Sequence, residues 1–344
     1  MKSIYTKQSI YLLIALLSLS LSTSCNSGKD KKDNWAYYQD RGSVFATGYS
    51  IKYAYDKSLK TDIETELERF DRSLNPFRKD AVITKFNKNE DVEIDSFFVN
   101  VLRRSRQISE QTNGYFDITV SPYINAWGFG FENIDSVTPE LIDSLRAFVG
   151  YDKISVDNDG NIVKSDPRVE INTSAIAKGY ACDVIADLLE SYGVRDYMVE
   201  IGGEVSAKGV NDKGVCWRIG VDKPIDDFFG RHDLHTILSL CDMSLATSGN
   251  YRNYYIKDGK KYSHTIDPFT GYPAETDLLG ATVLADDCMT ADAYATAFMA
   301  MGVEKACKIA DKVEGLHYYF IFADKNGEFE VVYSDGFEQF LPGN

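Results

Sequence analysis

The order of helical and strand patterns along the chain is the feature that most constrains its fold. Apolar residues recur with helical spacing in some segments, such as residues 61–74, and form short β-type runs in others, such as residues 197–201. The two kinds do not follow the strict order of repeating βαβ units, which favours an α+β fold. The other expected helices are residues 96–112, 138–150, 175–192 and 303–313 and one from Ala291; the other expected strands are residues 44–55, 169–171 and 279–285, with a hairpin over 317–333.

Capping residues predict where several of these helices begin. Asp95, Thr138 and Thr290 each stand just before an apolar periodic run, and Asn172-Thr-Ser174 precedes the helix expected from residue 175. Side-chain oxygens of these residue types accept hydrogen bonds from the first backbone N–H groups of a helix. We therefore expect all four positions to be helix N-caps.

The N-terminus has the pattern of a targeting segment. Lys2 and Lys7 precede a short apolar run that ends near Cys25, and the run is too short to span a membrane comfortably. Residues 1–24 are expected to be a lipoprotein signal peptide, Cys25 the lipidated residue, and residues 25–41 a flexible tether to a domain over 42–344. An ordinary signal peptide with an incidental cysteine is the alternative. With a lipid anchor, the protein would lie in the bacterial cell envelope and face the periplasm or exterior.

Charge and cysteine spacing exclude some classes of function. The chain of 344 residues has a formal net charge of −15, which argues against general nucleic-acid binding because that needs a basic face. Beyond Cys25, the cysteines are far apart and lack C-x-x-C spacing, so a structural zinc site is not expected. Some of them could pair in an oxidising compartment, but spacing does not say which.

A stretch over residues 247–273 contains more hydroxyl, Gly and Pro residues than a core hairpin needs. It opens with Thr247-Ser-Gly249, turns at Asp258-Gly259 and continues to Pro273. Hydroxyls and bare backbone N–H groups suit an anion. His264 is its one side chain of a type that titrates near neutrality. We interpret the stretch as one wall of a site for a phosphorylated ligand.

Three other features fit such a site, although each has a purely structural alternative. Lys178 lies at a helix start, where an anion is favoured, but many helices carry a solvent-facing lysine there. Trp127-Gly-Phe129 suits a flat ligand or a hydrophobic surface loop. Asp292 and Thr296 share a helical face and offer oxygens to Mg²⁺, unless Thr296 only bonds back to its own helix.

Seven segments together resemble the ApbE family of FAD:protein FMN transferases, and they occur in the family's order across residues 42 to 341. The resemblance implies an α+β fold, with mixed or antiparallel sheets, flanking helices and a central cleft for FAD and Mg²⁺. The segments are Gly114-x-Phe-Asp-Ile-Thr-Val, Trp127-Gly-Phe, Ala177-Lys-Gly-Tyr-Ala-x-Asp183, Ile201-Gly-Gly, Thr247-Ser-Gly-x-Tyr-Arg, Ser263-His-x-Ile-Asp-Pro-x-Thr-Gly-x-Pro273 and Ala291-Asp-Ala-x-Ala-Thr296.

The resemblance also implies roles for individual residues. The metal ligands would be the Ala181 carbonyl, Asp292 and Thr296. FAD would contact Trp127, Gly128, Phe129, Lys178, Asp183, Thr247, Ser248, Gly249 and His264, with Phe77 in the place of a family tyrosine.

The implied reaction moves FMN from FAD to a Thr or Ser hydroxyl of an acceptor protein and releases AMP. His264 would act as the base and Lys178 would add positive charge. Acceptors would be subunits of Na⁺-pumping NADH:quinone reductase or Rnf-type complexes, or other exported flavoproteins. Alternatives are an Mg²⁺-dependent FAD pyrophosphatase and a non-catalytic flavin-binding lipoprotein.

Overall fold

The computed structural model describes residues 35–129, 137–157, 161–223, 234–250, 254–257 and 260–342. The signal peptide, Cys25 and most of the predicted tether lie outside these residues. The prediction of a tether up to residue 41 is wrong in its last part, because strand β1 covers Ala36–Val44. Tyr38 of this strand stacks on Tyr53 with 5.7 Å between ring centroids, so core packing holds the segment. None of the helices in the described part of the chain is both long and apolar enough to cross a membrane.

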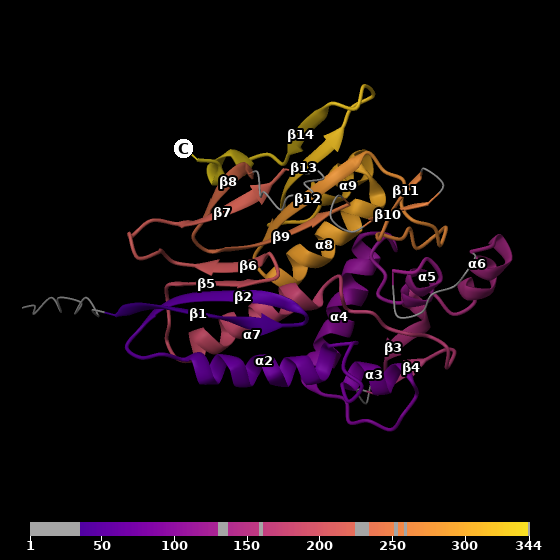
Figure 1. Ribbon diagram of the computed structural model, residues 1–344, viewed down its shortest axis with the longest axis horizontal. Helices are drawn as coiled ribbons and strands as arrows, with labels where there is room; N and C mark the ends of the chain where they lie inside the picture. Colours follow the sequence, from indigo (N-terminus) through magenta and orange to yellow (C-terminus); the bar gives the residue numbers. More distant parts are fainter. Residues whose placement is uncertain are drawn as a thin grey trace, which may run out of the picture. The chain divides into compact units, whose positions relative to one another are not determined.

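Eight strands form one sheet in the order β1-β2-β5-β6-β9-β12-β13-β14 (Figure 1). Every pair from β2 to β14 is antiparallel, which bears out the expectation of antiparallel pairing in an α+β fold. The further strands of this sheet are β2 (Thr47–Tyr55), β5 (Tyr197–Ile201), β6 (Glu204–Lys208), β9 (Met243–Gly249), β12 (Leu278–Ala285), β13 (His317–Ala323) and β14 (Phe329–Tyr333).

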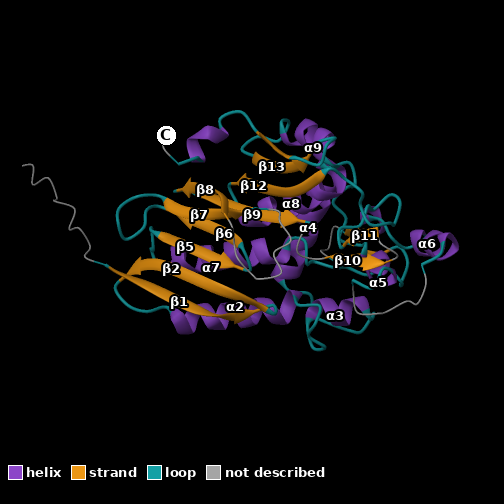
Figure 2. Ribbon diagram, turned by 45° about the horizontal axis from the view of Figure 1, so that its top comes forward, coloured by secondary structure: helices purple, strands orange, loops and turns teal. Residues whose placement is uncertain are grey.

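Helices cover one face of this sheet. Helix α7 (Ala177–Ser191) contacts β5 and β6, and α8 (Cys288–Met301) contacts β9 and β12. Helices α2 (Lys60–Leu74) and α4 (Ser96–Gln111) pack against α7 and α8 in turn (Figures 1 and 2). Helix α8 therefore lies between the sheet and a helix, which explains why its sequence is apolar nearly all round.

A second, smaller core lies on the other face of the sheet. Val205 and Leu245 of the sheet pack there with Trp217 and Leu238. The latter two come from a two-stranded sheet of β7 (Trp217–Asp222) and β8 (Leu234–Leu240). A disulfide between Cys216 and Cys241 joins the ends of this strand pair, a pairing that spacing alone did not identify.

The caps expected from sequence divide into two correct and two wrong predictions. The Asp95 and Thr138 side chains accept hydrogen bonds from Phe98 N and Leu141 N, as expected for N-caps. Helix α8 instead begins earlier, because the Asp287 side chain accepts from Thr290 N. Helix α7 begins at Ala177 with no side-chain cap.

The remaining elements are short. The strand expected at residues 169–171 is absent, because the Asn87 side chain, and not another strand, bonds both backbone groups of Ile171. The other bounds are α3 (Val82–Asn87), α5 (Ser121–Ala126), α6 (Pro139–Arg146), η1 (Tyr151–Lys153), β3 (Ile154–Val156), β4 (Ile162–Lys164), β10 (Tyr254–Lys257), β11 (Lys260–Ser263), α9 (Val303–Ala310) and η2 (Phe337–Phe340).

Candidate functional site

A cavity of about 440 Å³ brings together half of the predicted site residues; we call it the polar cavity. Its walls come from the start of α7, the β5–β6 turn, β7, the end of β9, the segment after β11 and the face of α8. Its lining includes seven residues singled out from sequence, namely Lys178, Thr247, Ser248, Gly249, His264, Asp292 and Thr296. Residues distant in sequence thus meet at one place.

The β5–β6 turn passes close to Lys178 because it consists of two glycines. Gly202 and Gly203 have φ values of 66° and 105°, which L side chains rarely adopt. A Cβ on Gly202 would lie 3.1 Å from Cδ of Lys178 and 2.9 Å from Cγ2 of Thr47. The turn therefore lets the lysine stem run alongside the backbone and places Glu204 at the first position of β6.

Lys178, Glu204 and Asp292 form a buried charged group in the polar cavity; we call it the Lys178 cluster. Lys178 Nζ makes an ion pair with Glu204 Oε1, and Asp292 Oδ2 accepts a hydrogen bond of 3.0 Å from Gly179 N. Glu204 and Asp292 are each only 3% exposed, whereas 33% of the Lys178 side chain is exposed. Glu204 Oε2 has no hydrogen-bond partner among the described residues.

Burial and mutual charge shift the pKa values in this cluster. Burial raises the pKa of the Asp292 carboxyl, while Lys178 and the Gly179 N–H oppose that shift. Burial, with Asp292 nearby, likewise raises the pKa of Glu204 despite the ion pair with Lys178. Burial alone would lower the pKa of Lys178, but the Asp292 and Glu204 carboxylates outweigh it and raise that pKa. Lys178 is thus a stable cation.

Close packing of α7 on α8 creates the contact between Gly179 and Asp292. A Cβ on Gly179 would lie 2.2 Å from the backbone oxygen of Cys288, so only glycine lets the two helices approach this closely. The start of α7 then points the Gly179 N–H at the Asp292 carboxylate. The Ala-Lys-Gly-Tyr-Ala segment is therefore also a helix-packing feature.

A second cavity of about 160 Å³ adjoins the polar cavity; we call it the apolar cavity. The two share Ser174, Ser248, His264 and Thr296 in their linings. Ser248 Oγ and Thr296 Oγ1 lie 3.3 Å apart at this junction. The rest of the second lining is largely apolar and includes Tyr115, Phe116, Val120, Ile124, Ile266 and Pro268. A ligand with an anionic part and a flat apolar part therefore has a place for each, with His264 between them.

The Gly114-x-Phe-Asp-Ile-Thr-Val motif shapes the wall of the apolar cavity. Asp117 Oδ1 accepts hydrogen bonds of 2.7 Å from both Thr119 N and Thr119 Oγ1, and Oδ2 accepts one of 2.9 Å from Tyr151 N. Thr119 Oγ1 in turn accepts from Gly150 N. Burial raises the pKa of the Asp117 carboxyl to about 6, although these donors act against the shift. The motif thus ties its loop to the start of η1.

Trp127, Gly128 and Phe129 do not line either cavity. Trp127 Nε1 donates a hydrogen bond of 2.8 Å to the backbone oxygen of Gly271, and its ring lies against Tyr272 at 5.3 Å. Trp127 therefore braces the segment that follows His264. Residues 130 and 131, directly after this motif, lie outside the described residues, as do Tyr251, Arg252 and the turn at Asp258-Gly259.

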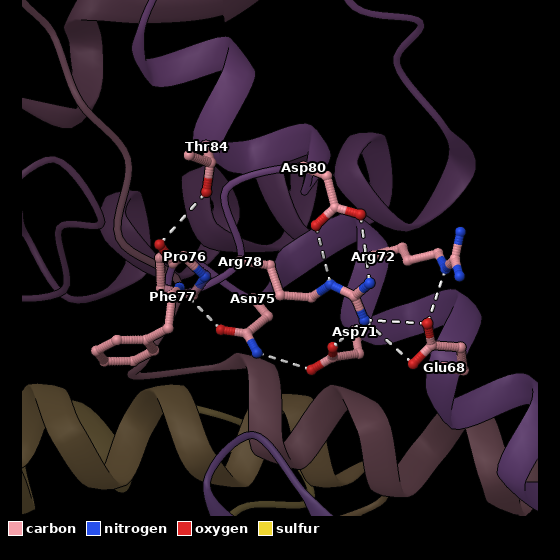
Figure 3. Close-up of polar contacts among 9 residues, drawn as sticks. All are labelled: Glu68, Asp71, Arg72, Asn75, Pro76, Phe77, Arg78, Asp80 and Thr84. Carbon is pink, nitrogen blue, oxygen red and sulfur yellow. Dashed lines mark hydrogen bonds and ion pairs between the residues drawn. The ribbon is translucent and has the colours of Figure 1, made fainter.

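Phe77 lies on the loop after α2 and is 71% exposed. Its backbone N–H bonds to Asn75 Oδ1, and the next residue, Arg78, pairs with Glu68, Asp71 and Asp80. Figure 3 shows the Phe77 ring directed away from this group, which we call the Arg78 cluster. The loop is firmly held, and Phe77 lines neither cavity.

Two further predicted residues are engaged in the packing of α7. The Asp183 carboxylate accepts hydrogen bonds of 2.8 Å from Cys288 N and Met289 N, at the start of α8. Burial, then the charge of Asp287, raises the pKa of Asp183 to about 8. Ala181 is fully buried within α7 and lines neither cavity. The predicted FAD contact of Asp183 and the predicted metal-ligand role of Ala181 stay predictions.

Sequence reasoning missed Glu204 and Ser174, although both line the polar cavity. The available signal for Glu204 was its position directly after Gly202-Gly203, at the start of a strand whose other residues are mostly buried. A carboxylate at such a position needs a partner or a ligand. Ser174 gave no signal beyond its place in the expected cap.

Comparison with known proteins places this geometry in a family. The ApbE family profile matches residues 45–320. The FAD:protein FMN transferase of Vibrio cholerae is 37% identical over 311 residues, covering 87% of this chain and 90% of that protein. That of Escherichia coli K12 is 35% identical over 292 residues, covering 82% of each.

Solved structures agree with the sequence comparison. The flavin transferase ApbE from Vibrio cholerae superimposes with a TM-score of 0.79 at 35% identity, covering 89% of this chain and all of that one. The apo Pseudomonas stutzeri flavinyl transferase ApbE gives 0.78 at 30% identity, covering 90% of this chain and 98% of that one. The chain therefore belongs to the ApbE family.

Proposed function

We propose that this protein transfers FMN from FAD to a Thr or Ser hydroxyl of an acceptor protein and releases AMP. The observation that carries the proposal is the junction of the polar and apolar cavities at His264. FAD contains both an anionic diphosphate and a flat ring system. The polar cavity suits the diphosphate, and the adjoining apolar cavity suits the ring system. The relatives named as FAD:protein FMN transferases support the same reaction.

The residues of the polar cavity fit a divalent cation such as Mg²⁺. The Lys178 cluster has one ammonium against two buried carboxylates, so a diphosphate entering it would meet excess negative charge. Asp292 and Thr296, one helical turn apart, would hold the ion, with the Ala181 carbonyl as the third ligand that the family resemblance implies. No group of three or more His, Cys, Asp or Glu side chains in the described residues forms a complete metal site, so phosphate and water oxygens would supply the rest. When bound, such an ion neutralises charge on the diphosphate and on the leaving AMP.

Among the residues of this chain, His264 would accept the proton and Lys178 would offset negative charge. The acceptor hydroxyl oxygen attacks the FMN phosphorus, a new phosphoester bond forms, and the bond from that phosphorus to the oxygen of the AMP phosphate breaks. His264, at the junction, accepts the hydroxyl proton. Lys178, held by Glu204, offsets negative charge on the phosphates.

The partners and location we propose follow from the same chemistry. Acceptors would be exported flavoproteins, including subunits of Na⁺-pumping NADH:quinone reductase or Rnf-type complexes. Lipidation at Cys25 would anchor the protein to a membrane of the cell envelope, on the periplasmic or exterior side. Metabolic labelling with a radioactive fatty acid tests the anchor: label should enter the wild type and be lost in Cys25→Ser.

The transfer is tested by mixing the full chain, purified in detergent, with FAD, Mg²⁺ and a candidate acceptor domain. We expect flavin fluorescence on the denatured acceptor and AMP in solution, with neither when Mg²⁺ is omitted. Free FMN and AMP without labelled acceptor would instead indicate a pyrophosphatase. Bound FAD without turnover would indicate a flavin-binding lipoprotein.

A further inference from the structure

Lys178 has two buried carboxylates within its reach, and only one of them is paired with it. Its ammonium makes an ion pair with Glu204 Oε1, while the backbone N–H of the next residue, Gly179, bonds Asp292 Oδ2. The charge of Asp292 also acts on Lys178 and raises its pKa. The ammonium is therefore ion-paired with Glu204, while the charge of the nearby Asp292 still acts strongly on it.

This arrangement matters if Asp292 is a metal ligand, as the proposed function holds. An ammonium and a divalent cation compete for the same carboxylate, and their mutual repulsion is strong in a poorly solvated cavity. A flexible lysine with no other partner would pair with Asp292, because a buried carboxylate left unpaired is costly.

Resting on that proposed function, we infer that Glu204 is a positioning residue that keeps the Lys178 ammonium away from Asp292 and so leaves Asp292 open to the cation. Glu204 suits this role because it is fixed at the start of β6, where it pairs with Ile201 of β5. Its backbone oxygen also accepts a hydrogen bond from Cys182 Sγ of α7.

The hydrogen bonds that the two carboxylates accept support the same assignment. Glu204 Oε2 has no hydrogen-bond partner among the described residues, so Glu204 retains capacity for the ammonium's remaining N–H groups. Asp292 Oδ2 is already engaged by the Gly179 N–H. Glu204 is therefore the better partner for Lys178 and needs no metal bond of its own.

The test is a double-mutant cycle read by metal binding. MgCl₂ is titrated by calorimetry into the full chain, in detergent and saturated with FAD, without an acceptor. Glu204→Gln keeps the shape and removes the charge, and we expect it to weaken Mg²⁺ binding by about tenfold, the size typical of residues that orient metal ligands. The double variant Glu204→Gln/Lys178→Met should bind Mg²⁺ with an affinity within about threefold of that of the single variant Lys178→Met. The reason is that the competing ammonium is absent from both.

The matched control is Glu200→Gln. Glu200 belongs to the same hairpin, and its Oε1 accepts from Gly203 N, but it does not line the polar cavity. We expect its Mg²⁺ affinity to equal that of the wild type. If Glu204→Gln does not fold, Glu204→Asp keeps the charge at shorter reach and should show a smaller loss, again rescued by Lys178→Met.

The possible outcomes separate this inference from the proposed function. If the wild type binds no Mg²⁺, the metal part of the proposed function fails and this inference fails with it. If the wild type binds Mg²⁺ but Glu204→Gln binds it equally well, the inference alone is wrong. A loss in Glu204→Gln that Lys178→Met does not rescue also overturns it, because the ammonium is then not the competitor.

Discussion

Two clusters in this molecule each place more than one carboxylate around a single cation, and they differ in how deeply most of those carboxylates are buried. In the Arg78 cluster, Arg78 bonds Glu68, Asp71 and Asp80 (Figure 3); Glu68 and Asp80 are largely exposed, whereas Asp71 is nearly buried. In the Lys178 cluster, both carboxylates are almost fully buried and one carboxylate oxygen has no partner among the described residues. The first fastens a loop, and the second lines a cavity.

The difference shows that a count of opposite charges does not identify a functional site. Exposed ion pairs are cheap to form and contribute little each, so they accumulate on surfaces. A buried, incompletely satisfied cluster costs free energy in the folded protein, and a ligand that completes it repays that cost. The Lys178 cluster is therefore the stronger candidate for a functional role.

The largest expected effect is on the reaction beside the Lys178 cluster. His264→Ala should lower the rate of FMN transfer by about 10²–10⁴-fold, because it removes the proposed general base. FAD binding should persist, since the other lining residues of both cavities remain. Transfer is measured as flavin on the denatured acceptor over a range of pH.

The control for that experiment is His317→Ala. His317 begins β13, contacts Ser334 Oγ at 3.3 Å, and lines neither cavity. Its variant should transfer FMN at the wild-type rate. A wild-type rate in His264→Ala across pH would show that the base lies elsewhere.

The next effect compares the two cations directly. Lys178→Met leaves two buried carboxylates without their cation, and removing one partner of a buried pair costs about 3–5 kcal/mol. We expect the lower end, because a third of the Lys178 side chain is exposed. The free energy of unfolding is measured in urea at low and at molar salt.

Arg78→Met supplies the matched half of that comparison. Its loss of stability should be smaller than that of Lys178→Met and should shrink further in molar salt, because two of the three carboxylates around Arg78 are largely exposed and salt screens exposed charges. Equal losses in the two variants, or equal salt dependence, would contradict the distinction between the clusters.

The sequence predicted local features well and the Lys178 cluster only in part. Strand 197–201 and the caps at Asp95 and Thr138 were correct, because periodicity and capping act within a few residues. The cap at residues 172–174 was wrong because two of its side chains are engaged elsewhere: Thr173 Oγ1 donates to the Leu74 backbone oxygen, and Asn172 Oδ1 accepts from Ser174 N. Glu204 was missed because only the packing of α7 against the β5–β6 hairpin brings it to Lys178.

Asp117 is a contrasting carboxylate: it is partly buried, its hydrogen-bond donors are backbone and hydroxyl groups, and no ion pair with it is found among the described residues. Its folded pKa of about 6 lies above the ordinary 3.8, so the folded protein binds the proton more tightly than the unfolded chain. The stability from this group is present below pH 4 and is lost as the pH rises through 6, by up to about 3 kcal/mol.

Asp117→Asn removes that pH dependence, since the amide does not titrate. The variant also loses one hydrogen-bond acceptor, because the asparagine NH₂ group replaces a carboxylate oxygen. That NH₂ group would face either the Thr119 hydroxyl or the Tyr151 N–H, which are donors to Asp117 in the wild type. The difference in unfolding free energy between wild type and variant should therefore shrink by up to about 3 kcal/mol from pH 4 to pH 7. A difference independent of pH would show that the Asp117 pKa is not raised.

The smallest effect is expected at Phe77, which the Arg78 cluster holds at the surface. Phe77→Ala should change the free energy of unfolding by no more than about 0.5 kcal/mol, because the ring is 71% exposed. If the ring stacks on FAD as the family resemblance implies, FAD affinity should fall about fivefold, the scale of one aromatic contact. Flavin fluorescence titration measures this, with Phe329→Ala, another exposed aromatic, as the control. An unchanged affinity would mean that the Arg78 cluster only fastens its loop, and that the ligand contacts lie entirely on the side of the Lys178 cluster.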